Sequence, residues 1–441
     1  MRIVFLGAGT LALILAGCSP KVQDLPKPKH HTDPPITVES GPGTAHAFGP
    51  MPDRLLRWMI GWKSMQLNAL DDKPEGGTMS GVSGTIYDDH GKANLTFSSR
   101  TAIGDSENQK LRLHGDVRVT STERQETLIS DALAYDAAAK LLTATGNVRF
   151  QGNVGSIGTF SELMATSDYK LIGTPQMFKS TMIVPSKGPD RKAALLALAA
   201  IAATASANQS YSYRSFDGTV SLRYGDIAVS AQPDGTRRMD LSGGVDGFSK
   251  TQGIHVHGNT ASVILDVTGK QARFRAIHLE NSVRLVQTSP DKHTTSIACD
   301  RADYLFGSNG ATVKATGHVL IINRDAKDHD LMSATGTALV ASLLPGKLPK
   351  GSTIPLKGAT LEGPVTGRLP QPPEAPGKAP TTVVVTGNRL IDRATTTGSE
   401  VDVEGNVVLT TKDGKLGPLD RIAIELDRLG KVLRAKGGTP K

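Results

Sequence analysis

The chain has 441 residues, enough for two or three domains. Its 47 glycines and only 4% aromatic residues favour strands and turns over a bundle of helices. The formal net charge of +8 comes from basic residues that are scattered along the chain without a dense block. This argues against a nucleic-acid-binding protein and favours an ordinary solvated surface, although it would also suit an anionic lipid surface.

The N-terminus has the form of a bacterial lipoprotein signal. Met1-Arg2 supplies a short positive region, residues 3–16 are apolar, and Leu15-Ala16-Gly17-Cys18 matches a lipobox. Because the apolar run is short and ends in small residues, we interpret residues 1–18 as an export signal rather than a membrane span. We expect lipidation of Cys18, whose acyl chains would anchor the protein. An ordinary signal peptide with an incidental cysteine is the alternative.

Two segments connect this signal to the first predicted domain. Residues 19–50 are rich in Pro, Lys, His, Thr and Gly without an apolar period, so we expect a flexible tether. Residues 54–67 contain Trp58 and Trp62, whose i,i+4 spacing would place both rings on one face of a helix. Such a helix would lie either at a membrane surface or against the domain.

A nine-residue pattern then recurs along the chain. Apolar residues alternate on both sides of a central glycine, which predicts a β-strand with one apolar face. The glycine leaves room on that face for a crossing backbone, a bend or a guest molecule. Four copies centre on Gly115, Gly146, Gly317 and Gly405, and a fifth, Ile277-Leu279-Asn281-Val283-Leu285, has Asn at its centre.

These strands predict two all-β domains, over residues 51–186 and 210–441. Between them, residues 187–209 form an Ala-rich hydrophobic segment that resembles a second export signal and ends in a small-x-small site at Ala207. Its fifteen-residue apolar stretch would span roughly 22 Å as a helix, less than the hydrocarbon core of a membrane. We interpret the segment as the join of two once-separate exported proteins. An Ala-rich helix that connects the domains is compatible with this view, and the pattern allows cleavage after Ala207 or retention.

Two further features belong to the second domain. Prolines cluster at both ends of residues 345–380, and because proline lacks the backbone donor of a β-ladder, we expect an insertion or hinge there. Cys299 stands beside an apparent strand and is interpreted as a small buried core residue.

The sequence contains no motif of a known catalytic site. It lacks a G-x-S-x-G elbow, an H-E-x-x-H zinc motif, a Walker loop and a paired cysteine motif. His255 and His257 share one strand face, but no third ligand has suitable spacing. We therefore expect no metal, no cofactor and no enzymatic activity. An envelope enzyme that acts on polysaccharide through paired carboxylates is an alternative.

The strands at 110–119 and 130–150 resemble the OstA-like periplasmic proteins of the lipopolysaccharide transport bridge. The run Leu111-Arg112-Leu113-His114-Gly115-Asp116-Val117 carries the likeness, and its echoes are Thr316-Gly317-His318-Val319 and Glu404-Gly405-Asn406-Val407. Residues 83–97 add a resemblance to the LptC-like, membrane-anchored members, so the first domain (51–186) is similar to them. The second domain is similar to the soluble, LptA-like members.

The resemblance implies two open β-jelly-roll domains, each twisted into a trough that shelters acyl chains. Exposed methylenes cost about 0.8 kcal/mol each, which is why such chains need shelter in water. The residues that we expect to line the trough are Leu113, Val117, Val119, Val148, Phe150, Val319, Ile321, Val403 and Val407.

The implied function is non-enzymatic. The protein would bind lipopolysaccharide or a related glycolipid and pass it across the periplasm, with energy from a separate ATPase complex. It would be anchored by lipid to an inner or outer envelope membrane and would join other bridge proteins by edge-strand addition. The alternative is a β-rich scaffold or adhesin of the cell envelope, with a filled core and no lipid transport.

Overall fold

One antiparallel sheet organises the whole chain. The computed structural model describes residues 36–49, 54–70, 73–105, 109–124, 126–152, 155–183, 210–215, 218–250, 253–267, 272–288, 292–307, 310–343, 356–371, 381–395, 398–427 and 432–437. These residues form 27 strands, all joined in the same sheet, and one helix. The predicted all-β class is confirmed.

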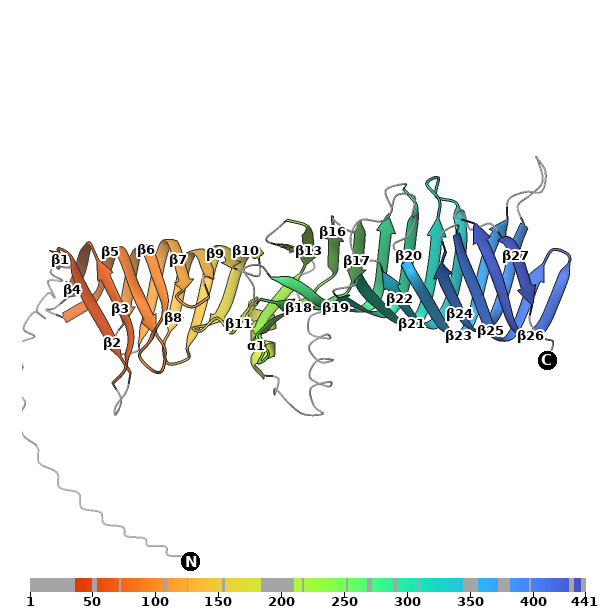
Figure 1. Ribbon diagram of the computed structural model, residues 1–441. Coiled ribbons are helices and arrows are strands. Elements are labelled where there is room, and N and C mark those ends of the chain that lie inside the picture. Colours follow the sequence, from red (N-terminus) through yellow and green to blue (C-terminus); the bar gives the residue numbers. More distant parts are fainter. Residues whose placement is uncertain are drawn as a thin grey trace, which may run out of the picture.

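The sheet is elongated, with β1 near one end and β26 and β27 at the other (Figure 1). The N-terminal half consists of β1 (Ile36–Ser40), β2 (Gly43–Phe48), β3 (Leu56–Trp62), β4 (Ser64–Leu70), β5 (Lys73–Tyr87), β6 (Ala93–Asp105), β7 (Lys110–Ser121), β8 (Thr127–Asp136), β9 (Leu141–Gly152) and β10 (Gly155–Thr166).

Shorter elements form the middle of the molecule. They are β11 (Leu171–Gly173), α1 (Pro175–Ile183), β12 (Tyr211–Arg214), β13 (Val220–Tyr224), β14 (Asp226–Ala231), β15 (Thr236–Ser242), β16 (Val245–Ser249), β17 (Ile254–Gly258) and β18 (Thr260–Asp266).

Long strands return in the C-terminal part. They are β19 (Arg273–Thr288), β20 (Thr294–Gly307), β21 (Gly310–Arg324), β22 (Asp330–Leu343), β23 (Leu356–Gln371), β24 (Thr381–Ala394), β25 (Gly398–Thr411) and β26 (Gly414–Asp427), followed by the short β27 (Val432–Gly437).

Most long strands bend near their middle. The ladder between β21 and β22 is interrupted between Thr316 and Val319, and Gly317 and His318 have φ angles of 74° and 45°. Two successive left-handed residues cannot continue a pleated strand, so the chain turns a corner there. Val313 and Ile321 lie on opposite sides of this corner and line the same cavity, whereas in a straight strand they would be about 26 Å apart.

The same corner occurs in every copy of the sequence repeat. Each copy has two successive residues with positive φ, and these pairs are Gly115-Asp116, Gly146-Asn147, Asn281-Ser282, Gly317-His318 and Gly405-Asn406. Of the three roles considered for the central glycine, the structure therefore assigns the bend. The two arms of each bent strand turn their apolar faces towards each other, and this builds a two-layered molecule from one sheet.

A side chain of the neighbouring strand covers each of the four corners that contain a glycine. Asp300 lies over Gly317 and its Oδ2 is 2.9 Å from Nδ1 of His318. At another corner Asp131 covers Gly146 and accepts a hydrogen bond from Asn147. Asp116, Asn147 and His318, the residues after three of these glycines, each bind the side chain that covers the corner.

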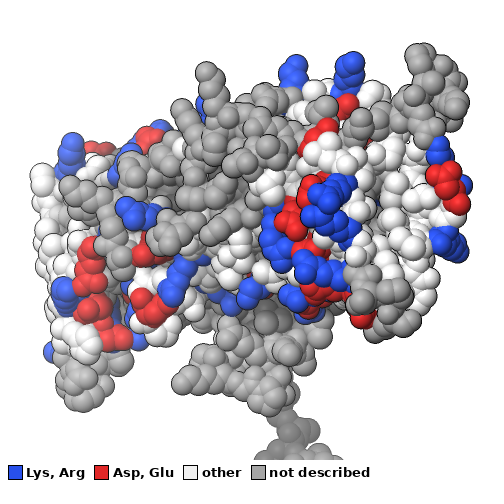
Figure 2. All heavy atoms as spheres, turned by 45° about the vertical axis from the view of Figure 1, so that its right-hand side comes forward, with Lys and Arg blue, Asp and Glu red and all other residues white. Residues whose placement is uncertain are grey.

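Charged residues on the outer faces of the sheet lie in pairs of opposite charge. Around the corners, Arg389 lies within 4 Å of both Glu362 and Glu404, and Arg301 pairs with Glu280. On the face shown in Figure 2, Lys and Arg lie beside Asp and Glu. Because these pairs are exposed, each contributes little to stability, and they mainly keep the outer surface polar.

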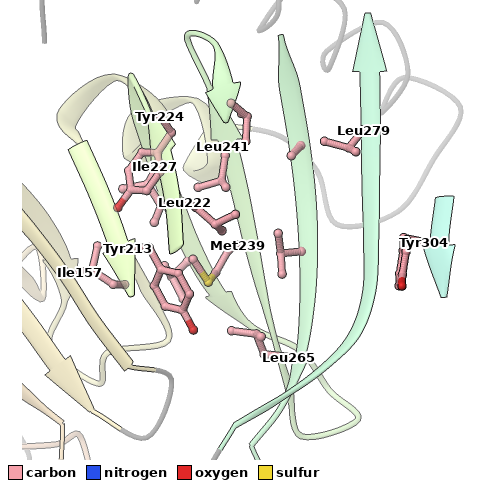
Figure 3. Close-up of a cluster of buried hydrophobic side chains, with 14 of the residues drawn as sticks. Ile157, Tyr213, Leu222, Tyr224, Ile227, Met239, Leu241, Leu265, Leu279 and Tyr304 are labelled. Carbon is pink, nitrogen blue, oxygen red and sulfur yellow. The ribbon is translucent and has the colours of Figure 1, made fainter. Parts of the chain in front are cut away.

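In the middle of the molecule the two layers are formed by different short strands and not by the two arms of one bent strand. The beginning of β10 pairs with β12 and its end with β11. Likewise, β19 pairs with β18 along its first part and with β17 along its last part. The hydrogen-bonded order β10–β12–β13–β16–β17–β19–β18–β15–β14–β11 returns to β10 and closes a ring. Figure 3 shows side chains from the strands of this ring. Ile157, Tyr213, Met239 and Leu265 point into a common core.

The ring crosses the predicted boundary between the two domains. Residues 187–209, the expected Ala-rich junction, lie outside the described residues, but strands on both sides of it are hydrogen-bonded to each other. A buried ion pair reinforces this contact. Nη2 of Arg237 in β15 lies 2.8 Å from both carboxyl oxygens of Glu126, and Nη1 donates to the carbonyl oxygen of Tyr169. The two halves therefore form one continuous structure.

Three expectations about the N-terminal region need correction or fall outside the described residues. The tether predicted over 19–50 is too long, because β1 and β2 lie inside that range. The helix predicted over 54–67 is wrong. These residues form most of β3 and β4, and Trp58 is 1% exposed in the core, so tertiary burial overrides the helical spacing. The lipobox at Cys18 is not among the described residues.

The proline-rich insertion predicted over 345–380 is only partly supported. Residues 344–355 and 372–380 are not described, but 356–371 form β23 between β22 and β24. The strand tolerates its prolines for two reasons. Pro364 follows the positive-φ Gly363 at the corner, where the ladder is interrupted, and Pro370 lies beyond Arg368, where pairing with β22 has ended.

The corner geometry predicts a large cost for Gly317→Ala. A Cβ at this position would lie 2.2 Å from Oδ2 of Asp300, and the φ of 74° already disfavours any side chain. We expect the free energy of unfolding to fall by at least about 2 kcal/mol, measured by urea denaturation. Gly244→Ala is the matched control, because Gly244 has a φ of 81° and nothing within 4 Å of the added atom. Equal losses in the two variants would contradict the role of Asp300.

The buried ion pair predicts strong coupling between Arg237 and Glu126. Replacing Arg237 by Met leaves a buried carboxylate without its cation, and we expect a loss of about 3–5 kcal/mol in stability. Adding Glu126→Met should restore much of this loss, because the double variant buries no unpaired charge. The measurement is a double-mutant cycle by thermal or urea unfolding. Additive single losses would show that the pair does not act as a unit.

Candidate functional site

An apolar cavity lies between the two layers of the C-terminal part. Its volume is about 80 Å³, and its lining comes from both arms of the bent strands β20, β21 and β22 together with β17, β19, β23 and β24. The register of the sheet explains this lining, because directly paired residues on neighbouring strands point to the same side.

The first wall contains two rows of paired residues. The outer row, nearer the hairpin turns, is Ile254, Gln287, Thr295, Asn323 and Met332, in which each residue pairs with the next. The inner row, one step closer to the corners, is Leu285, Ile297, Ile321 and Ala334. Polar side chains therefore stand at the hairpin side, and the surface becomes wholly apolar deeper inside.

The second wall repeats this arrangement from the other arms. Its outer row is Tyr304, Val313, Ala341, Ala359 and Asp392, and its inner row is Leu339, Leu361 and Leu390. All of these residues line the cavity.

Small side chains explain why space remains between the walls. Ala341 and Ala359 are direct partners in the second wall, and Ala334 stands in the first. The N-terminal half has larger side chains in its interior rows, where Phe97, Val119, Leu128 and Phe150 are direct partners across four strands. The C-terminal walls thus remain apart where the N-terminal layers fill the space between them.

A second apolar cavity adjoins the first along the sheet. It has a volume of about 50 Å³ and shares Ile254 and Tyr304 with its neighbour. Its remaining lining is Val220, Leu222, Gly247, Phe248, Ser249, Val256, Phe274, Ile277, Leu279 and Phe306. Two apolar cavities therefore lie next to each other between the layers of the sheet.

Two polar oxygens in this apolar lining have no partner. Within the described part of the chain, Oδ1 of Asn323 and Oδ1 of Asp392 are buried and make no hydrogen bond. Burial raises the pKa of the Asp392 carboxyl to about 6, although a hydrogen bond from Ser399 opposes this shift. Buried oxygens without partners are costly, so these two are the exceptional atoms of the site.

Of the nine residues predicted to line the trough, one lines a cavity and eight are packed in the core. Ile321 lines the larger cavity. The other eight are at most 1% exposed, packed in the core, and line neither apolar cavity: Leu113, Val117, Val119, Val148, Phe150, Val319, Val403 and Val407. Phe150, for example, packs edge-on against Tyr169 with ring centroids 5.8 Å apart.

Sequence reasoning missed most of the lining that the cavities use. The best available signal was the fifth repeat, since its Ile277, Leu279 and Leu285 all line the cavities. Ala341 and Ala359 have no signal in the sequence, because only the strand register shows that they are direct partners in one wall. Cys299 is buried as predicted, and burial raises its thiol pKa to about 11, so the thiol stays protonated.

A polar depression of about 520 Å³ lies in the N-terminal half. Its charges are largely paired with one another. Asp89 binds Lys140 and Arg57, which lower its pKa, and Lys92 lowers the pKa of Glu123. A general acid for glycoside hydrolysis needs a raised carboxyl pKa, and these two carboxyl groups have the opposite shift.

Metal binding has no support among the residues described. His255 and His257 both point to the exposed face of β17, and the His255 ring lies against Phe248 with centroids 4.3 Å apart. No group of three or more His, Cys, Asp or Glu side chains in the described ranges has a geometry that could hold a metal ion.

Comparison with protein-family models and with curated proteins finds no match to this chain. In the described ranges, no helix has the length and apolar character needed to span a membrane.

The raised pKa of Asp392 predicts a pH-dependent stability. Between the ordinary pKa of 3.8 and about 6 the folded chain holds a proton at this site that the unfolded chain releases. The contribution of the protonated Asp392 carboxyl to the free energy of unfolding is therefore present at low pH and is lost as the pH rises through about 6. Asp392→Asn removes the ionisation, and we expect it to raise the free energy of unfolding by about 1–2 kcal/mol at neutral pH, with little effect in acid. Urea denaturation at neutral and at acidic pH measures this change in the free energy of unfolding, with the exposed Asp413→Asn as control. A gain that did not depend on pH would contradict the raised pKa of Asp392.

Proposed function

We propose that this protein binds the acyl chains of lipopolysaccharide or a related glycolipid between its two walls and passes the lipid across the periplasm. The observation that carries the proposal is the pair of adjoining apolar cavities inside one continuous sheet. A fatty chain is apolar, and the lining of both cavities is mostly apolar. No hydrolysis is needed for such binding, so the role is non-enzymatic.

The polarity gradient supports entry of the chain from the hairpin side. Gln287, Thr295, Asn323 and Asp392 stand in the outer rows and are partly exposed. Beyond them the inner rows offer only apolar surface. A polar head group would thus stay at the hairpin edge while its chain lies between the walls, because each buried methylene contributes about 0.8 kcal/mol.

The ends of the sheet support partners that join by strand addition. Among the described strands, β27 pairs only with β26, and β1 pairs only with β4. Each therefore leaves one edge with free backbone groups, to which a strand of another bridge protein can add. Lipidation at Cys18 would hold the assembly at an inner or outer envelope membrane. The proposal includes no nucleic-acid partner and no cofactor.

A structural scaffold is the second candidate. The packed N-terminal core favours it, because five predicted lining residues there are buried against protein side chains: Leu113, Val117, Val119, Val148 and Phe150. A scaffold needs a filled interior and no lipid binding. The two functions therefore differ in one measurable property, which is saturable binding of acyl chains in the C-terminal part.

The decisive variant fills the cavity. Ala341→Phe places a ring between the walls, and we expect at least a tenfold weaker affinity for a fluorescent fatty acid that lipopolysaccharide displaces, because tenfold is about 1.4 kcal/mol, less than the burial of two methylenes. Val340→Phe is the matched control, since Val340 is 46% exposed on the outer face of the same strand. Unchanged binding by Ala341→Phe, or no saturable binding by the natural chain, would favour the scaffold.

A further inference from the structure

The two orphan oxygens in the cavity indicate what kind of chain it accepts. Asn323 belongs to the outer row of the first wall and Asp392 to the outer row of the second. Both line the larger cavity, and the Oδ1 atom of each is buried without a hydrogen-bond partner in the described ranges. A plain hydrocarbon chain packed against them would leave both oxygens desolvated and unsatisfied, at a cost.

We propose that Asn323 and Asp392 select acyl chains that carry a hydroxyl group close to the head group. The inference rests on the proposed function and names its preferred substrate class. A hydroxyl is small enough for an apolar cavity and has one donor and two acceptor sites, so it can serve a carboxyl oxygen or a side-chain amide.

The position of the oxygens determines where the hydroxyl should be. The outer rows lie near the hairpin turns, with Asn323 next to the end of β21 and Asp392 close to the end of β24. Deeper inside, the walls present Leu285, Ile297 and Ile321. A chain that enters from the hairpin side therefore passes the oxygens with its first carbons and the apolar rows with the remainder.

The raised pKa of Asp392 agrees with this assignment. Burial shifts the pKa to about 6, so the site favours the neutral carboxyl more than an exposed aspartate does. Its neighbours in the second wall are Ala359 and Val401, neither of which offers a side-chain hydrogen bond. The hydrogen bond from Ser399 accounts for one interaction of the carboxyl group and leaves Oδ1 available.

The test compares two chains that differ by one oxygen atom. Dodecanoate and 3-hydroxydodecanoate compete for the full-length protein against a fluorescent fatty acid. Both carry the same carboxylate, so the ratio of their affinities isolates the hydroxyl group. We expect the natural chain to prefer the hydroxylated acid about fivefold, the size of one net hydrogen bond.

Variants assign the preference to these residues. The double variant Asn323→Leu with Asp392→Leu should bind both acids equally, with the unsubstituted acid bound at least as tightly as before. Asn323→Leu alone should weaken the preference, and this single variant keeps the test decisive if the double variant does not fold. Ser262→Ala is the matched control, because Oγ of Ser262 is likewise buried without a partner but lines neither apolar cavity.

The outcomes separate the two proposals. If the natural chain bound both acids equally, or if the preference survived in the double variant, the selection by Asn323 and Asp392 would be wrong while lipid binding would stand. If neither acid bound, the proposed function itself would fail and this inference with it. Loss of the preference in Ser262→Ala would also overturn the assignment, since that residue lies outside the cavity.

Discussion

The corner in the middle of each long strand is the constraint on which the rest of this structure depends. A strand with a uniform apolar face would expose that face or need a second sheet to cover it. Here two successive left-handed residues turn the strand so that its own two arms face each other. Gly317 can adopt this conformation without a Cβ, and Asp300 of the next strand covers the position and holds His318. Each bend thus depends on its neighbour, and the corners align along the sheet.

Repetition of this unit produces a molecule that is long in one direction and only two layers thick. The space between the two layers runs along the sheet, and the side chains that point into it determine whether it is filled. In the N-terminal half Phe97 and Phe150 occupy it, whereas Ala341 and Ala359 leave it partly open in the C-terminal part. One backbone plan therefore provides both a packed interior and an interior with apolar cavities, and the halves are held together by strand pairing and by the buried Arg237–Glu126 pair.

The polar atoms of the cavity fit this division of roles. Protein interiors rarely leave oxygens without partners, and the cavity contains two of them, on Asn323 and Asp392. Both occur in the outer rows, where the walls meet the hairpin edge, and not in the inner rows. An apolar interior with unsatisfied acceptors at its edge is suited to a ligand with a greasy chain and a polar group near its head. This is the chemistry of the glycolipid proposed here.

The sequence alone determined the all-β class, the strand faces and the positions of the central glycines, because alternation and glycine spacing are local properties of the chain. The structure showed that these glycines mark corners. Resemblance added the idea of a lipid trough. Local pattern also misled in places: Trp58 and Trp62 have helical spacing but lie in a strand, because burial of Trp58 in the core outweighs an i,i+4 preference. The prolines of 345–380 suggested a break, but Pro364 fits at a corner and Pro370 fits at a strand end that pairs with β24 alone.

Only the tertiary structure decided where the interior stays open. Phe150 and Ile321 each stand four residues after the central glycine of their repeat, yet Phe150 is buried in the packed core and Ile321 lines the cavity. The difference comes from residues on other strands, such as Ala334 beside Ile321 and Leu128 beside Phe150. Space between side chains depends on register and on contacts between residues far apart in the chain, and a sequence pattern that is read one strand at a time contains neither.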